Sequence, residues 1–237
     1  MPGPASGLWL FLHGVGERWP LLRSRLPLAV VEASWARHLA GEGPLVAFLG
    51  DSLTAGWRLR EDEAWPARLA RLLEAGGRSI RAPNAGVSGD TVARGAARLP
   101  GVLRLRPDVL VVALGINDAL QGRSLEDVER GLRGIAAGAS GEGVRVLLVG
   151  VRLPPFVPGV EGARAPERVR FFTELYPRLA AELRLPLVPD LLDGVAGDPG
   201  RLFRDRLHPN ASGHVRIAEN VLPALERVLA EIEAARR

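Results

Sequence analysis

The chain lacks cysteine and lysine, and it contains only one methionine and one glutamine among its 237 residues. Without cysteine, disulfide bonds and thiolate chemistry are excluded. Without lysine, all 31 basic residues are arginine. A shortage of thermolabile side chains suits a hot environment. A GC-rich genome would give the same bias, so the sequence leaves both explanations open.

Long hydrophobic runs and clusters of like charge are also missing. The apolar segments 8–12 and 26–31 are too short to span a membrane, and neither has the pattern of a clean secretory signal. We therefore expect no transmembrane segment and a cytoplasmic protein, with a periplasmic or secreted location as the alternative. The net charge of +4 comes without a basic stripe, so we expect no nucleic-acid partner.

From residue 44 onward, short apolar runs alternate with amphipathic segments. Strands are predicted at 45–49, 79–82, 109–114, 144–151 and 187–188, and helices at 62–74, 90–99, 125–139, 166–183 and 211–235. We expect the second helix to stop near Pro100, and a break near Pro223 in the last helix stays open. This alternation predicts an α/β fold with a parallel sheet of about five strands and helices on both faces.

Small polar residues gather just after several of these strands. They occupy 50–56, 84–91, 115–118 and, in the loop before the last helix, 205–210. Because ligands of parallel α/β sheets bind beyond the carboxyl ends of the strands, these four clusters predict a functional site at one edge of the sheet.

Three of these side chains can form a nucleophilic site. A serine hydroxyl such as Ser52 is a poor nucleophile unless a base takes its proton. His208 is the candidate base, and Asp205, three residues earlier, is the carboxylate that would orient it. An ion pair of Asp205 with a neighbouring arginine is the alternative for that residue.

A tetrahedral intermediate formed on Ser52 would also need hydrogen-bond donors for its oxyanion. The candidates are the backbone N–H groups of Ser52 and Gly89 and the side-chain amide of Asn117. Glycine suits position 89 because the missing Cβ lets the backbone approach a substrate. A turn-holding role for Asn117 and a helix-start role for Gly89 are the simpler alternatives.

The same blocks carry a family resemblance. Gly-Asp-Ser-Leu, Ser-Gly-Asp-Thr, Gly-x-Asn-Asp and Asp-x-x-His-Pro-Asn follow one another in the order found in the SGNH (GDSL) hydrolases. The local sequence of these blocks is most similar to the thioesterase I, lysophospholipase L1 and arylesterase branch, and the resemblance covers roughly residues 44 to 230. The resemblance implies a three-layer flavodoxin-like fold, no cofactor, and hydrolysis of carboxylic esters or thioesters through an acyl-enzyme. It also implies the catalytic roles given above to Ser52, Asp205 and His208, and the oxyanion roles of Gly89 and Asn117.

Three carboxylates, Asp51, Asp90 and Asp118, lie at the same predicted edge. Hard cations bind such oxygen ligands, but carboxylates after strands more often hold loops or cap helices. We expect the second role and no metal site.

The substrate is less determined than the chemistry. Ile116, Phe156 and the loop 152–166 supply apolar candidates for an acyl site, which favours longer acyl or aryl groups over the small groups of a deacetylase. Arg206 stands where relatives have a small residue. The expected partner is a small-molecule ester or acyl compound bound by a monomer. A carbohydrate or small-molecule deacetylase is the alternative enzyme, and a non-catalytic binding module is the alternative class.

Residues 1–43 precede the α/β pattern and form a tryptophan-rich N-terminal extension, with residues 44–237 as the hydrolase domain. Leu28, Val31, Trp35 and Leu39 are spaced to share one helical face. We expect this helix to pack on the core. A lid over the acyl site or an anchor on a membrane surface is the alternative.

Overall fold

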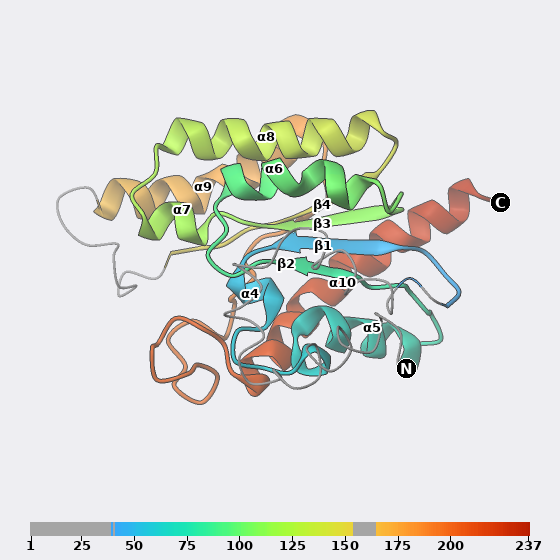
Figure 1. Cartoon of the computed structure of the whole chain (residues 1–237), viewed down its shortest axis with the longest axis horizontal. Helices are drawn as coiled ribbons and strands as arrows, with labels where there is room; N and C mark the ends of the chain where they lie inside the picture. The colour runs from blue at the N-terminus through green and yellow to red at the C-terminus, as the bar shows by residue number, and fades with distance from the viewer. Residues whose placement is uncertain (1–38, 40, 154–164) are drawn as a thin grey trace, which may run out of the picture.

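The computed structural model describes residues 39, 41–153 and 165–237, and its centre is a parallel sheet (Figure 1). The strands lie in the order β2-β1-β3-β4-β5. Their bounds are β1 Val46–Gly50, β2 Asn84–Gly86, β3 Val109–Ala113, β4 Arg145–Val149 and β5 Leu187–Val188. Nearly every strand residue is buried, as expected for a sheet covered on both faces. The predicted three-layer flavodoxin-like architecture is confirmed.

Helices cover the two faces of the sheet unequally. On one side lie α6 (Val92–Leu103), α7 (Ile116–Leu120), α8 (Leu125–Gly141) and α9 (Ala165–Leu183), and on the other α5 (Trp65–Ala75) and α10 (Ala211–Ala235) pack together (Figure 1). The short helix α4 (Ser52–Ala55) follows β1 directly, and a 3₁₀ turn, η1 (Glu61–Glu63), precedes α5. No helix in the described residues is both long and apolar enough to cross a membrane.

The strand order locates the functional edge. The chain leaves β1 for the edge strand β2 and then returns to β3 on the other side of β1. The loops after β1 and β3 therefore diverge, and such a divergence is where open α/β sheets bind ligands. Ser52 follows β1 and Asn117 follows β3, so both predicted residues lie at this point.

The second strand differs from its prediction. It comprises Asn84–Gly86 rather than 79–82, and Arg81 contributes only an isolated bridge to Leu45. Residues 84–86 have low strand propensity. Their pairing with β1, from Phe48↔Asn84 to Gly50↔Gly86, defines the strand instead.

Two prolines do not end their helices as expected. α6 runs past Pro100 to Leu103, so the predicted stop is wrong, and α10 continues through Pro223. Both prolines lie on the exposed side of their helices, where water can satisfy the carbonyl oxygen that loses its N–H partner. Buried residues beyond each proline, such as Val102 and Leu225, keep the helix packed on the core.

The predicted N-terminal extension lies almost entirely outside the described residues. The division into residues 1–43 and 44–237, and the helix expected around Trp35, therefore stay predictions.

Candidate active site

The structure brings Ser52, His208 and Asp205 into one hydrogen-bonded chain. His208 Nε2 lies 3.0 Å from Ser52 Oγ, and His208 Nδ1 lies 3.0 Å from Asp205 Oδ2. The second carboxylate oxygen of Asp205 accepts hydrogen bonds of 3.0 Å from the backbone N–H groups of Leu207 and His208. The carboxylate is thus fixed by its own loop and fixes the imidazole in turn.

A tight loop before α10 makes this geometry. The Phe203 N–H donates to the His208 carbonyl oxygen over 2.8 Å, and the Arg206 N–H donates to the Phe203 carbonyl oxygen over 3.0 Å. Arg206 adopts a left-handed conformation with φ of 57°. The loop therefore turns sharply between Asp205 and His208, so that a separation of three residues becomes a side-chain contact.

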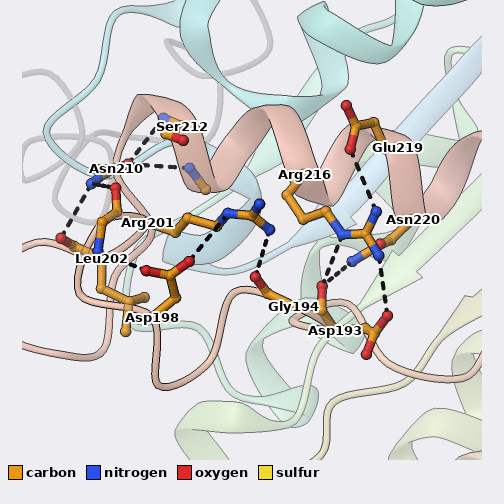
Figure 2. A network of polar contacts seen from close by, with 12 residues as sticks. Asp193, Gly194, Asp198, Arg201, Leu202, Asn210, Ser212, Arg216, Glu219 and Asn220 are labelled. Carbon is orange, nitrogen blue, oxygen red and sulfur yellow. Dashed lines mark hydrogen bonds and ion pairs between the residues drawn. The ribbon is translucent and has the colours of Figure 1, made fainter.

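The start of α10 anchors this loop (Figure 2). Asn210 caps the helix by accepting hydrogen bonds from the Ser212 and Gly213 N–H groups, and its amide donates to the carbonyl oxygens of Gly200 and Leu202. Before the loop, Arg201 pairs with Asp198 and donates to the Gly194 carbonyl oxygen. In α10, Arg216 pairs with Asp193 and Glu219. Asn220 donates to the Asp193 carbonyl oxygen. The loop that carries Asp205 and His208 is therefore held on both sides.

The imidazole of His208 also stacks on an aromatic ring. The Trp57 and His208 ring centroids are 4.1 Å apart with an interplanar angle of 27°. The Arg58 guanidinium lies 4.2 Å from the Trp57 centroid, and Phe203 meets Trp57 edge-on at 6.0 Å. These contacts hold the ring in the orientation in which Nε2 faces Ser52.

Burial and charge set the protonation of this pair. Burial lowers the pKa of His208, and Arg58 lowers it further, whereas Asp205 raises it; the net shift is downward. For Asp205, burial raises the pKa, but the hydrogen bonds from His208 and Leu207 outweigh it and hold the pKa below its usual value. At neutral pH a neutral imidazole therefore faces the serine and an ionised carboxylate faces the imidazole, as a general base requires.

The predicted oxyanion donors Gly89 and Asn117 lie in loops that contact each other. Gly89 has φ of 82°, and a Cβ there would meet no atom within 4 Å, so the space beside it is open. The Asn117 amide donates 2.9 Å to the Asp90 carbonyl oxygen, which places it against the loop that carries Gly89 and leaves its second N–H for another acceptor. Within the described part of the chain, the backbone N–H groups of Ser52 and Gly89 donate no hydrogen bond.

The three carboxylates of this edge hold its loops, as expected. Asp51 caps α4 by accepting 2.9 Å from the Leu53 N–H, and Asp118 accepts 2.9 Å from the Val92 N–H. Asp90 forms an ion pair with Arg98 at 2.7 Å. Among the described residues, no group of three or more His, Cys, Asp or Glu side chains is placed to hold a metal ion.

Arg98 is a structural residue that sequence reasoning missed. Besides Asp90, it donates to the carbonyl oxygens of Ala85 and Gly50. It therefore ties the ends of β1 and β2 to the loop of Gly89. Its position among the buried residues of α6 is the signal that could have found it, because an arginine on a buried face needs several partners.

The acyl contacts predicted for Ile116 and Phe156 stay predictions. Ile116 is only 2% exposed and belongs to the hydrophobic core, so any contact with an acyl group stays a prediction. Phe156 lies outside the described residues. Trp57, which sequence reasoning gave no role, stacks directly on His208.

A parallel α/β sheet with a serine, histidine and carboxylate chain beside amide donors defines the class of serine ester hydrolases. The model of the GDSL-like lipase/acylhydrolase family matches residues 48–216, and the chain belongs to this family. It is a hydrolase of carboxylic esters or thioesters, as the four sequence blocks predicted.

Characterised relatives cover most of the chain. Esterase TesA of Pseudomonas aeruginosa is 37% identical over 182 residues, which are 76% of this chain and 87% of that protein. Thioesterase 1/protease 1/lysophospholipase L1 of Escherichia coli is 34% identical over 200 residues, 84% of this chain and 90% of that protein. The crystal structure of TesA superposes with a TM-score of 0.72 at 36% identity, covering 78% of this chain and 99% of that one.

Proposed function

We propose that Ser52 is the nucleophile, His208 the general base and acid, and Asp205 the carboxylate that orients His208. Ser52 attacks the acyl carbonyl while His208 takes its proton, and an acyl-enzyme forms. His208 then protonates the departing alcohol or thiol, and water activated by the same histidine releases the acid. The observation that carries the proposal is the unbroken chain of two 3.0 Å contacts from Asp205 through His208 to Ser52.

The oxyanion of the tetrahedral intermediate lies, in this proposal, between the N–H groups of Ser52 and Gly89 and the amide of Asn117. The open space beside Gly89 and the spare N–H of Asn117 support it. Donors fixed in place before the reaction stabilise the developing charge without reorganisation.

The substrates that we propose are aryl esters and medium- or long-chain acyl esters or thioesters. The support comes from relatives that are named esterase, arylesterase and thioesterase/lysophospholipase. Hydrolysis of p-nitrophenyl esters from acetate to palmitate tests this class. A profile confined to acetate would instead indicate a deacetylase.

Ser52→Ala is the decisive variant in that panel. Loss of the nucleophile is expected to lower turnover by several orders of magnitude, roughly a millionfold by analogy with serine proteases. Circular dichroism of the variant controls for folding. A folded Ser52→Ala variant with wild-type turnover would refute the serine mechanism, and a folded wild type inert on every ester would favour a binding module.

Asn117→Ala tests the oxyanion hole. Removing one donor should lower kcat on the order of a hundred- to a thousandfold while KM changes little, because the bond forms fully only in the transition state. The same substitution also removes the contact with Asp90, so the melting temperature is measured alongside. Near wild-type kcat would remove Asn117 from the proposed hole.

We further propose a monomeric, cytoplasmic protein. The chain contains no cysteine, so its fold needs no disulfide-forming compartment, which is consistent with this location. Light scattering after size exclusion measures the molar mass in solution, and fractionation of the native cells locates the protein.

A further inference from the structure

A surface cavity of about 580 Å³ opens beside the catalytic loop. The described residues that line it are Gly197, Pro199, Leu202, Phe203, Arg204 and Arg206. Two of these side chains are cationic, the others are apolar or glycine, and none is acidic. The cavity thus pairs an apolar surface with positive charge.

The two arginines of this cavity have no counter-charge. Both are exposed, and within the described residues neither Arg204 nor Arg206 forms a hydrogen bond or ion pair through its side chain. Other arginines of the same region are paired: Arg201 binds Asp198, and Arg216 binds Asp193 (Figure 2). The positive charge at the cavity is therefore available to an external anion.

The cavity is lined by neighbours of the proposed catalytic residues. Arg206 lies between Asp205 and His208 in sequence, and the ring of Phe203 meets Trp57, which stacks on His208. In the proposed mechanism His208 gives its proton to the departing group. The alcohol or thiol half of the substrate therefore lies on the side of His208, where this loop and its cavity begin.

Arg206 also occupies an unfavourable backbone conformation. Its φ of 57° lies in the left-handed region, which glycine adopts freely and an L-residue with a Cβ adopts at a cost. An arginine at this position places a positive charge at the cavity that glycine would not supply.

We propose that this cavity binds an anionic group, a phosphate or carboxylate, carried by the alcohol or thiol half of the substrate, with Arg204 and Arg206 as its cationic residues. The inference rests on the proposed function, because it assigns the leaving-group side of that site. It makes the charge of the leaving group a determinant of specificity, separate from the length of the acyl chain.

Two matched substrate pairs test the proposal. The oxygen-ester pair is 4-(hexanoyloxy)benzoate and its neutral methyl ester, and the thioester pair is S-hexanoyl-4′-phosphopantetheine and neutral S-hexanoyl-pantetheine. Each pair keeps the acyl group and changes the charge of the leaving group. Wild type is expected to favour the anionic member about three- to tenfold in kcat/KM, since each exposed charge contact contributes a few-fold. Added salt should reduce the ratio.

Variants assign that preference to the cavity. Arg206→Gly and Arg204→Gln are each expected to reduce the ratio, and the double variant should bring it close to one. Arg184→Gly is the matched control, because Arg184 also has a left-handed backbone with φ of 52° but lies after α9, away from the cavity. It should leave the ratio unchanged. Loss of preference in one pair only would assign the site to alcohols or to thiols.

Three outcomes would overturn the inference: no preference in either wild-type pair, an unchanged ratio in the double variant, or an equal loss in Arg184→Gly. Failure of the proposed function looks different, because neither member of either pair would then be hydrolysed. NMR line broadening of 4-hydroxybenzoate by the full chain measures binding without turnover. Even if no ester is hydrolysed, broadening by wild type that is lost in the double variant supports an anion site in the cavity. No broadening by wild type overturns the inference.

Discussion

His208 lies between a carboxylate in its own loop and an aromatic ring backed by an arginine. Asp205 raises the pKa of His208, whereas burial and Arg58 lower it. The Trp57 ring contacts both the imidazole and the guanidinium. His214 of α10 is the other titratable neighbour, and its own pKa is lowered far enough that it stays neutral near pH 7. Arg58 is therefore the cation that influences the proposed base at neutral pH.

Replacing Arg58 by Gln should move the activity profile toward higher pH. His208 is active in this mechanism when neutral, so kcat/KM rises with pH through the pKa of His208. Without Arg58 the imidazolium is less disfavoured and that pKa rises. The pH dependence of kcat/KM for p-nitrophenyl butyrate measures the shift. Arg60→Gln serves as control, because Arg60 pairs with Asp62 instead. A shift toward lower pH, or the same shift in both variants, would contradict this reading.

The contacts that join Asp205, His208 and Ser52 could be predicted from the sequence, but the contacts around them could not. Asp205 and His208 are three residues apart, so their contact needs only a local turn. The stacking of Trp57 on His208 joins residues far apart in the chain, and it depends on where α10 lies against the loop after α4. Arg98 likewise binds the ends of two strands at once. Neither arrangement leaves a periodic signal.

Among the elements, those with strong periodicity could be predicted and those defined by neighbours could not. β1 and β3 are apolar runs buried on both faces, so composition identifies them. β2 consists of Asn84–Gly86 and exists because β1 offers an edge for pairing. The helices α4 and α7 were not predicted, since four or five residues are too few for a helical stripe.

Two buried titratable side chains, His214 and Asp51, hold the starts of helices. His214 of α10 accepts 3.0 Å from the Trp65 N–H at the start of α5, and burial lowers the pKa of His214 to about 3. Asp51 caps α4, and burial raises its pKa to about 7. Each is neutral over part of the range in which the unfolded chain is charged, so each makes stability depend on pH.

The two groups act with opposite sign. Between about pH 3 and 6.5 the unfolded chain binds a proton at His214 that the folded chain does not, so this group makes stability rise with pH. Between about pH 4 and 7 the folded chain holds a proton at Asp51 that the unfolded chain releases, so this group makes stability fall as pH rises.

Asparagine at each position should therefore have opposite effects. An Asn side chain keeps an acceptor for Trp65 N–H or Leu53 N–H but does not titrate. Between about pH 4.5 and 6, His214→Asn is expected to lower the slope of unfolding free energy against pH by about 1.4 kcal/mol per unit, and Asp51→Asn to raise it by about the same amount. Urea unfolding at several pH values measures both slopes. Changes of equal sign would show that these pKa shifts are not the cause.

At the scale of the whole molecule, surface ion pairs contribute less than the core. Arg133 and Arg178 share Glu129 and Glu182 between α8 and α9, and these side chains are partly exposed. Exposed pairs are worth little each, whereas the hydrophobic core extends through the sheet and both helical layers. Stability should therefore respond most to changes in apolar packing.

Removal of residues 1–38 tests whether apolar packing at the N-terminus contributes to stability. The sequence predicts that Leu28, Val31 and Trp35 share one helical face, and we expect this face to pack on the hydrolase domain. Loss of about 2–3 kcal/mol of apolar burial would lower the melting temperature by roughly 5 to 10 °C in a domain of this size. Calorimetry measures the melting temperature of the truncated chain, and ester turnover is measured on the same samples.

A full-length variant with serine at all three stripe positions separates packing from chain length. If the extension packs on the core, this variant loses as much stability as the truncated chain, and both bind more of a hydrophobic dye. If the extension is a lid, the melting temperature stays within about 2 °C of wild type while the preference among p-nitrophenyl esters of different length changes. The first result would make residues 1–38 part of the folded domain, and the second would make them part of substrate selection.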